Sequence, residues 1–326
     1  MRKHPYFQIA KIIILLFMAF FSSGPGTITA AGNYALSKGR MYRVYCKALV
    51  KNSGGTATNL KIRFPVFARA NLPPYQTLNS WRASPANLRF NNDALEYTLP
   101  RLARNQTVSL EAEFTFTNWA IRYPLAPYYD SYQIEARYLA PEQGIETAAP
   151  PIVALAKKIV NPGDPGLEKA KKIFAFVNHY LNYDLNGPSD HSALQALSQR
   201  HGTCEDYSLL FVALCRAAQV PARVVSGYRF DPGEVDGREA DLDPFAHAWA
   251  EVYLPPGGWT TVDPTFVYTV NGAKAVSYDF FGNIAAQDRH LFSSYNLASR
   301  ATSIWDYDFK SPAKVEIIFQ RRIRGL

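Results

Sequence analysis

The segment from Gly202 to Ala218 constrains the fold most, because it joins a helix start signal to a long apolar run, GTCEDYSLLFVALCRAA. Thr203 can serve as the N-cap, with Asp206 three residues later as a carboxylate variant of the capping box. Cys204 then occupies the first helical position. The run after it is apolar on nearly every side, which predicts a helix buried inside a larger domain.

The position of Cys204 bears on its chemistry. The positive end of the helix dipole favours a thiolate, the nucleophilic form of cysteine. Glu205 and Asp206 oppose this effect, so a reactive thiol also needs a nearby cation such as a protonated histidine. A lone cysteine in such a helix would ordinarily be a structural core residue. A catalytic interpretation therefore depends on finding its partners elsewhere in the chain.

Residues 246–265 predict a β-hairpin, with AHAWAEVYL and WTTVDPT on either side of a PPGG turn. In the first strand, His247, Trp249, Glu251 and Tyr253 alternate with small and aliphatic residues, so these four side chains share one face. Positions 247 and 263 are equally distant from position 255 in the turn. Antiparallel pairing then brings His247 and Asp263 roughly opposite each other, where the carboxylate can orient the imidazole.

These blocks, at 202–206, 247–249 and 259–265, resemble in type and order those of the transglutaminase-like superfamily of papain-type thiol enzymes. The resemblance covers roughly residues 150–270. It implies that Cys204 is the nucleophile, that His247 is its general base and acid, and that Asp263 orients His247. It implies no cofactor and no metal ion.

A thiolate–imidazolium pair attacks a carboxamide carbonyl, forms a thioester and passes the acyl group to an amine or to water. The expected partner is therefore a protein or peptide substrate. The triad alone does not separate amide crosslinking, deamidation and peptide hydrolysis. The Cys204 N–H is one expected oxyanion donor, and Gln195, Tyr183 and His201 are alternatives for the second.

A second hypothesis is a non-catalytic binding or scaffold protein at the cell surface that retains the fold. All three catalytic positions are filled, which favours the enzyme. Iodoacetamide discriminates between the two, because only an enzyme requires a Cys204 whose reactivity depends on His247.

Residues 1–31 resemble a secretory signal peptide, with Arg2, Lys3 and Lys11 around the start of an apolar run at 12–21 and small residues up to Ala31. The run is short for a membrane span, although an uncleaved N-terminal anchor is an alternative. We therefore expect a secreted, periplasmic or cell-surface protein, without a stable membrane span once the leader is cleaved.

The formal net charge of the whole chain is +8, and loss of the three cationic leader residues lowers it to +5. This excess could favour anionic cell-surface polymers. Nucleic acid is not an expected partner, because no basic cluster is interleaved with aromatic residues. The basic segment 321–324 is expected to be a solvated tail.

The chain contains three cysteines, Cys46, Cys204 and Cys215. Cys204 and Cys215 lie about 16 Å apart if they share one helix, too far for a disulfide. A bridge from Cys46 to Cys215 would have to cross domains. The thiol of Cys204 is therefore expected to be unpaired.

The predicted fold class is α+β: an immunoglobulin-like β-sandwich at 34–140, a linker at 141–151 and a papain-like core at 152–326 with helices packed on an antiparallel sheet. Strands are predicted at 41–50, 60–67, 94–99, 107–116, 131–138, 222–229 and 315–322, the last closing the sheet of the core. Helices are predicted at 152–160, from 164–165 onward, at 189–200 and from Cys204.

Three further features have no fixed role in the sequence. The acidic segment 231–244 is expected to be a mobile lip on the active-site cleft, with calcium binding as an alternative. The loops at 71–76 and 122–129 are expected to pack at the domain interface, with polymer binding as an alternative. His290 belongs to no motif and is expected to be a surface or structural histidine.

Overall fold

The computed structural model describes residues 34–91, 93–126, 135–186, 191–266, 268–271, 273–295, 303–309 and 313–326, the segment 303–309 as backbone only. The predicted leader at 1–31 lies outside the described residues. Within these residues, no helix has the length and apolar character needed to cross a membrane.

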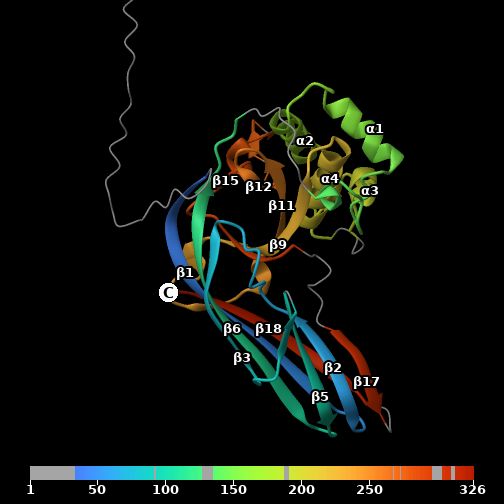
Figure 1. Cartoon of the computed structure of the whole chain (residues 1–326), viewed down its shortest axis with the longest axis vertical. Helices are drawn as coiled ribbons and strands as arrows, with labels where there is room; N and C mark the ends of the chain where they lie inside the picture. The colour runs from blue at the N-terminus through green and yellow to red at the C-terminus, as the bar shows by residue number, and fades with distance from the viewer. Residues whose placement is uncertain are drawn as a thin grey trace, which may run out of the picture.

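The lower half of the molecule is a β-sandwich of two sheets (Figure 1). One sheet has the order β10-β18-β1-β6-β15, with β3 also paired to β6, and the other has the order β17-β2-β5-β4. The first consists of β1 (Ala35–Asn52), β3 (Gln76–Ser84), β6 (Thr107–Arg122), β10 (Glu239–Asp241), β15 (Asn283–Ile284) and β18 (Val315–Gly325). The second consists of β2 (Ala57–Pro65), β4 (Arg89–Asn91), β5 (Ala94–Leu102) and β17 (Ser303–Phe309).

Alternating side chains of these strands fill the core of the sandwich. In β1, the second half alternates buried and partly exposed positions, and Val44, Cys46, Ala48 and Val50 face inward. This period of two is what a half-buried strand requires. The predicted sandwich, and the predicted strands at 41–50, 60–67, 94–99 and 107–116, are confirmed. Residues 136–138 were predicted to end a strand but form a 3₁₀ helix, η1 (Ala136–Tyr138).

The end of the chain returns to the sandwich. The predicted strand at 315–322 exists, but β18 pairs with β1 from Tyr42 to Asn52 and does not close the sheet of the core. Similarly, β17 pairs with β2. The assignment of all of 152–326 to a C-terminal domain is therefore wrong for its last strands. A strand's alternation shows that it needs a partner but does not identify that partner.

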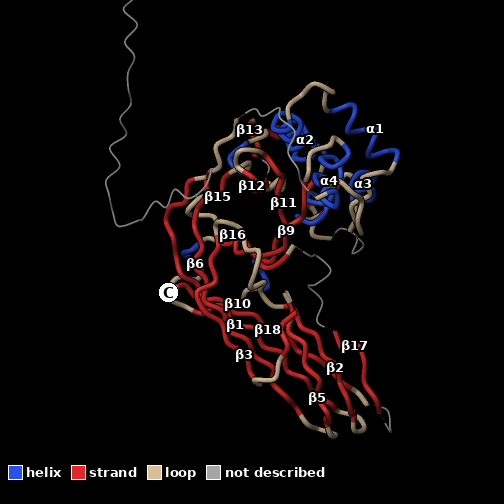
Figure 2. Tube along the Cα trace, viewed as in Figure 1, coloured by secondary structure: helices blue, strands red, loops and turns tan. Residues whose placement is uncertain are grey.

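The upper half contains helices packed on one face of a four-stranded antiparallel sheet (Figures 1 and 2). The helices are α1 (Pro150–Ile159), α2 (Gly166–Tyr180), α3 (Ala193–Gln199) and α4 (Cys204–Ala217). The sheet has the order β12-β11-β9-β16, formed by β9 (Ala222–Phe230), β11 (Ala246–Leu254), β12 (Gly258–Val262) and β16 (Arg289–Ser294). Two separate two-stranded sheets complete the upper half. One pairs β7 (Asn182–Tyr183) with β8 (His201–Gly202), and the other pairs β13 (Tyr268–Val270) with β14 (Ala273–Ala275).

Helix α4 is the centre of the upper half. Nearly all of its residues are buried, as its sequence predicts, and it packs on α1, α2, α3 and β11. The predicted α+β class is confirmed.

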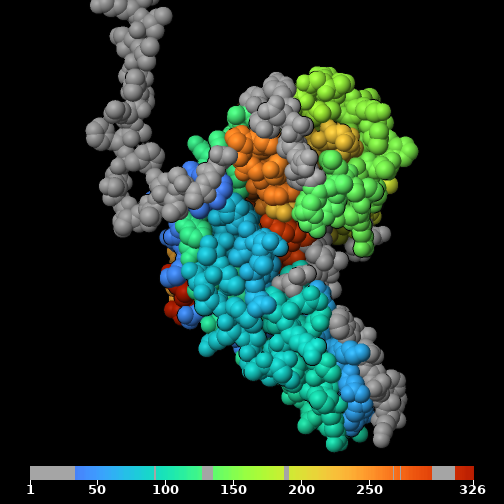
Figure 3. Space-filling view, viewed as in Figure 1, coloured from blue at the N-terminus to red at the C-terminus, as the bar shows by residue number. Residues whose placement is uncertain are grey.

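The other face of the four-stranded sheet packs against the sandwich. A separate buried cluster joins the two halves, with Leu36, Tyr75, Ile121, Tyr123 and Ile284 on one side and Val225, Trp249 and Phe292 on the other. In the space-filling view, the blue and cyan N-terminal segments abut the orange C-terminal segments (Figure 3). The interface role predicted for the loop at 71–76 is confirmed by Tyr75, which is fully buried in this cluster.

The acidic segment 231–244 is not a mobile lip. It contains η2 (Pro232–Glu234), β10 and η3 (Asp243–Phe245), and β10 adds a strand to the sandwich by pairing with β18. Three of its carboxylates lie against arginines: Asp236 pairs with Arg40, Glu239 with Arg322 and Asp243 with Arg321. These contacts also show that 321–324 is part of a strand and not a solvated tail.

The place of β18 in the sandwich yields a prediction. Ile323 is fully buried among side chains of the sandwich core, so Ile323→Ala should lower the free energy of unfolding by about 2–5 kcal/mol. The control is Arg322→Ala in the same strand, whose side chain is 53% exposed and should cost less than about 1 kcal/mol. Urea denaturation measures both. Equal effects of the two substitutions would contradict the assignment of β18 to the core.

Candidate active site

The start of α4 is held by the carboxylate of Asp206. The backbone N–H of Thr203 donates to Asp206 Oδ2 at 2.8 Å, which is the predicted capping interaction. His191 Nδ1 lies 3.0 Å from both carboxylate oxygens of Asp206. Because Asp206 ties together the residue before the helix and a residue outside it, the N-terminus of α4 has a fixed position.

Gly202 explains how Asp206 comes so close to the chain before the helix. A Cβ at position 202 would lie 2.4 Å from Asp206 Oδ2, much closer than two such atoms can approach. Only glycine leaves room for the carboxylate at this point. The glycine therefore serves the cap and, through it, the position of Cys204.

Cys204 is the first residue of α4, as predicted, and it is 8% exposed. Its thiol is not in a disulfide, and neither are those of Cys46 and Cys215. The side chain of Cys204 forms a hydrogen bond with His247, which lies at the start of β11. The sulfur and the imidazole thus meet although 43 residues separate them in the sequence.

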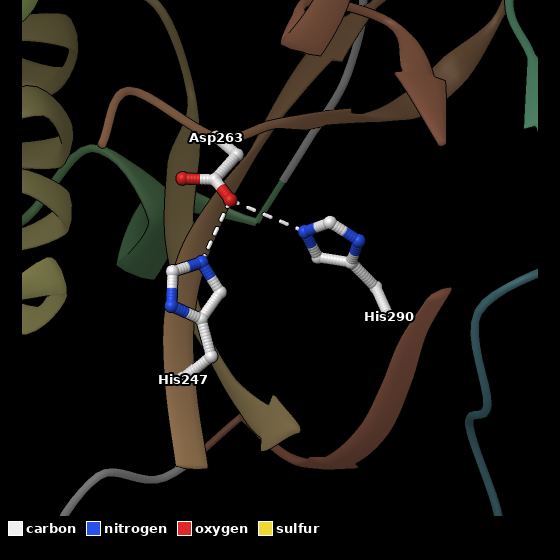
Figure 4. Close-up of side chains that lie close together, drawn as sticks. All are labelled: His247, Asp263 and His290. Atoms are coloured by element: carbon white, nitrogen blue, oxygen red, sulfur yellow. Dashed lines mark hydrogen bonds and ion pairs between the residues drawn. The ribbon is translucent and has the colours of Figure 1, made fainter. Parts of the chain in front are cut away.

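His247 also contacts Asp263, with 2.7 Å between Nε2 and Oδ2 (Figure 4). Since Asp263 occupies Nε2, the other ring nitrogen, Nδ1, is left for the sulfur. The predicted contact is confirmed, but the predicted register is two residues off: the ladder pairs Ala250 with Val262 and Leu254 with Gly258. Asp263 lies just beyond the end of β12, and its N–H donates to Phe280 O at 2.9 Å, outside the ladder.

The charges of this pair stabilise each other. Burial lowers the pKa of His247, but the charge and hydrogen bond of Asp263, together with Cys204, outweigh burial and raise that pKa to about 10. Burial raises the pKa of Asp263, but His247 and then His290 outweigh it and hold the pKa of the carboxyl well below its ordinary range. The favoured state is therefore an imidazolium beside a carboxylate.

His290 is a site residue that the sequence did not reveal. It is 2% exposed, and its Nε2 lies 3.1 Å from Asp263 Oδ2, the oxygen that His247 also contacts (Figure 4). Of the two expected alternatives, a surface or a structural histidine, the surface position is wrong. No local sequence pattern around Arg289–Ser294 predicts this contact. The contact depends on the order of strands in the sheet, where β9 lies between β16 and β11.

Gly227 in β9 allows side chains to meet across that central strand. It lies opposite His247 on one side and Phe292 on the other. A Cβ at 227 would lie 2.5 Å from the Trp249 ring and 2.2 Å from the carbonyl oxygen of Leu291. The indole uses this space and packs edge-on against the His290 ring, with centroids 5.0 Å apart. Glycine inside a strand commonly marks such a close approach.

Ligand atoms of His247, Asp263 and His290 lie within 4.8 Å of one another, a spacing that a metal ion could also bridge. Hydrogen bonds already account for this grouping, since the Nε2 atoms of His247 and His290 both lie within hydrogen-bonding distance of Asp263 Oδ2. A metal ion bound there would take the nitrogen that links His247 to Asp263. The donor set therefore fits the predicted triad better than a metal centre.

The three alternatives for the second oxyanion donor have different surroundings. His201 lies 3.4 Å from Asp184, and Gln195 has a buried Oε1 without a hydrogen-bond partner among the described residues. The pKa of Tyr183 is raised by partial burial and then by the charges of Cys204 and Asp263. Among the three alternatives, Tyr183 is the residue whose pKa is affected by the charge of Cys204.

Residues 153–264 match the family model described as the transglutaminase-like superfamily. A protein-glutamine gamma-glutamyltransferase of Pseudomonas aeruginosa is 41% identical over 68 residues, 21% of this chain and 10% of that protein. A kyphoscoliosis peptidase of Homo sapiens is 30% identical over 125 residues, 37% of this chain and 19% of that protein. The matches thus span between about a tenth and a fifth of these relatives.

A solved structure resembles the chain over most of its length. A candidate cysteine protease from Cytophaga hutchinsonii superimposes with a TM-score of 0.54, covering 90% of this chain and 100% of that one at 18% identity. At this identity, the likeness shows a shared fold. The resemblance inferred from the three sequence blocks is confirmed.

The thiol–imidazole contact predicts how Cys204 reacts. Because the raised pKa of His247 keeps the imidazolium charged up to pH of about 10, iodoacetamide should alkylate Cys204 well below pH 8. At pH 6, His247→Ala should slow this reaction at least about tenfold, and the difference should shrink above about pH 8.5, where a thiol of ordinary pKa ionises without help. Buried Cys46 and Cys215 provide unreactive internal controls. Indifference to His247 would contradict the pairing.

The approach of Asp206 to Gly202 yields another prediction. Gly202→Ala should push the carboxylate away, cost about 1 kcal/mol of stability as the cap is lost, and reduce the alkylation rate of Cys204. Gly163→Ala is the matched control, because nothing lies within 4 Å of a Cβ there. Thermal unfolding and alkylation kinetics measure the effects. Equal stability and equal alkylation rates in the two variants would contradict a role for Gly202 in positioning Cys204.

Proposed function

We propose that this chain, whose residues 153–264 match the transglutaminase-like superfamily, is a thiol enzyme that acts on carboxamides of proteins or peptides. Cys204 is the nucleophile, His247 the general base and acid, and Asp263 the residue that orients His247. One observation carries the proposal: the Cys204 side chain forms a hydrogen bond with His247, whose Nε2 lies 2.7 Å from the buried carboxylate of Asp263.

In the first half-reaction, the Cys204 thiolate attacks the carboxamide carbonyl and a carbon–sulfur bond forms. The imidazolium of His247 protonates the departing nitrogen, the carbon–nitrogen bond breaks, and a thioester remains. Asp263 keeps the proton of His247 on Nε2, so that Nδ1 faces the sulfur and exchanges the catalytic proton.

In the second half-reaction, an amine or a water molecule gives a proton to His247 Nδ1 and attacks the thioester. The carbon–sulfur bond breaks, and the thiolate–imidazolium pair is restored. The Cys204 backbone N–H at the start of α4 serves as one donor to the oxyanion, where the helix dipole also favours negative charge. Tyr183 is the proposed second donor. No step requires a cofactor.

The acyl acceptor distinguishes the possible activities. One relative is named for transfer from glutamine and another as a peptidase, so these names support both amine and water as acceptors. The proposed setting is outside the cytoplasm, on the strength of the leader-like residues 1–31 and the excess of positive charge, which suits substrates on anionic cell-surface polymers.

A product assay tests this function. The purified protein is incubated with a glutamine-containing peptide, with and without a labelled primary amine, and the products are identified by mass. Transfer adds the amine, deamidation adds about one mass unit, and hydrolysis shortens the peptide. Any of these products supports the thiol chemistry.

Two variants are the controls for this assay. Cys204→Ala should abolish turnover while the fold persists, since a small residue is tolerated at a helix start. Asp263→Asn should slow turnover on the order of 10²–10⁴-fold by disturbing the tautomer of His247. Turnover that survives Cys204→Ala would exclude the proposed mechanism, and unchanged turnover in Asp263→Asn would exclude Asp263 from it.

A further inference from the structure

We propose that His290 is a fourth member of the site, a positioning residue that holds Asp263 in place for His247, and that the β-sandwich sets its position by gripping the backbone of β16. This inference rests on the proposed function, because it concerns the same thiol chemistry. It extends the triad by a residue that lies outside the region matched to the family, 153–264.

The contacts of Asp263 come from three directions. Its Oδ1 accepts the backbone N–H of Thr265 at 3.1 Å. Its Oδ2 lies 2.7 Å from His247 Nε2 and 3.1 Å from His290 Nε2. The carboxylate is 3% exposed, so water contributes little to its stability. Donors on both oxygens leave the carboxylate little freedom to rotate away from His247.

The protons of this group can be assigned from the hydrogen bonds. An ionised carboxylate only accepts, so both Nε2 atoms must carry a proton. His290 Nδ1 is buried and has no hydrogen-bond partner among the described residues. A second proton on the His290 ring would therefore be a buried donor without an acceptor. Nε2 is therefore the nitrogen through which His290 acts on Asp263.

The sandwich reaches His290 through two buried amide side chains. Asn118 of β6 donates from Nδ2 to the carbonyl oxygen of His290 at 2.9 Å. Gln76 of β3 pairs with the backbone of Phe292 in both directions, each hydrogen bond being 2.8 Å long. β16 is an edge strand of its sheet, and these amides occupy hydrogen-bonding groups that a further strand would use.

Other charged groups near this assembly already have partners. Arg229, opposite His290 in β9, forms an ion pair with Asp288 at 2.6 Å. Tyr183 responds to the charges of Cys204 and Asp263, and Cys204 forms a hydrogen bond with His247. Among the described side chains, His247 and His290 are those that donate to Asp263 Oδ2.

The test compares two substitutions at position 290. In His290→Gln, the amide nitrogen takes the approximate place of Nε2 and retains a donor, whereas His290→Leu removes it. The rate of Cys204 alkylation at pH 6 should fall about tenfold in His290→Leu and stay within about threefold of wild type in His290→Gln. Equal rates for wild type and His290→Leu, or equal losses in the two variants, would overturn the proposal.

A double-mutant cycle separates positioning from mere structural support. If His290 acts through Asp263, His290→Leu should slow alkylation by less than about twofold when Asp263 is already Asn. A purely structural role would produce the same loss in both backgrounds and would overturn the proposal. If His247→Ala alone leaves the alkylation rate of Cys204 unchanged, the proposed function is overturned instead.

The role of the sandwich has its own variant. Asn118→Leu removes the donor to the His290 backbone without touching the triad, and it should lower the alkylation rate about threefold or more. Combined with His290→Leu, it should cause less than about a twofold further loss, because both act on the same contact. A wild-type rate in Asn118→Leu, or fully additive losses, would contradict the proposed grip on β16.

Discussion

The site depends on keeping one carboxylate ionised where water scarcely reaches it. An unpaired charge buried in a protein costs many kcal/mol, so Asp263 is stable only because donors surround it. Those donors come from β11, β16 and the segment just after β12, which converge although they are spread over some forty residues of sequence. The imidazolium of His247 depends on that charge, and so does the thiolate that we propose for Cys204.

This dependence gives the β-sandwich a share in holding the proposed site together. The four-stranded sheet has helices on one face and the long strands β1 and β6 near the other, so that Trp249 and Phe292 lie in a core built from both halves. The sandwich also binds the edge of β16 through Asn118 and Gln76. The fixed relation between the two halves is therefore part of what aligns the triad.

The sequence predicted the parts of the site that depend on local patterns. The cap at Thr203 and the alternation around His247 placed Cys204 and His247 correctly, since both depend on neighbours a few residues away. Contacts between distant segments were harder. The hairpin register was wrong by two residues because Asp263 lies beyond the ladder, and His290 and the pairing of β18 were missed because such partners are set only by the tertiary fold. The acidic segment 231–244 looked mobile for the same reason: its arginine partners lie far away in the sequence.

The pairing of β1 with β18 has a consequence for biosynthesis. These strands pair over eleven positions, yet roughly 270 residues separate the paired positions. Contacts of such long range form late, because closing a long loop of chain costs entropy before the strand pair repays it. The first sheet can be completed only after β18 has left the ribosome, by which time the whole helical half has been translated. A translation product that stopped before β18 would thus lack a finished sheet beneath the proposed site.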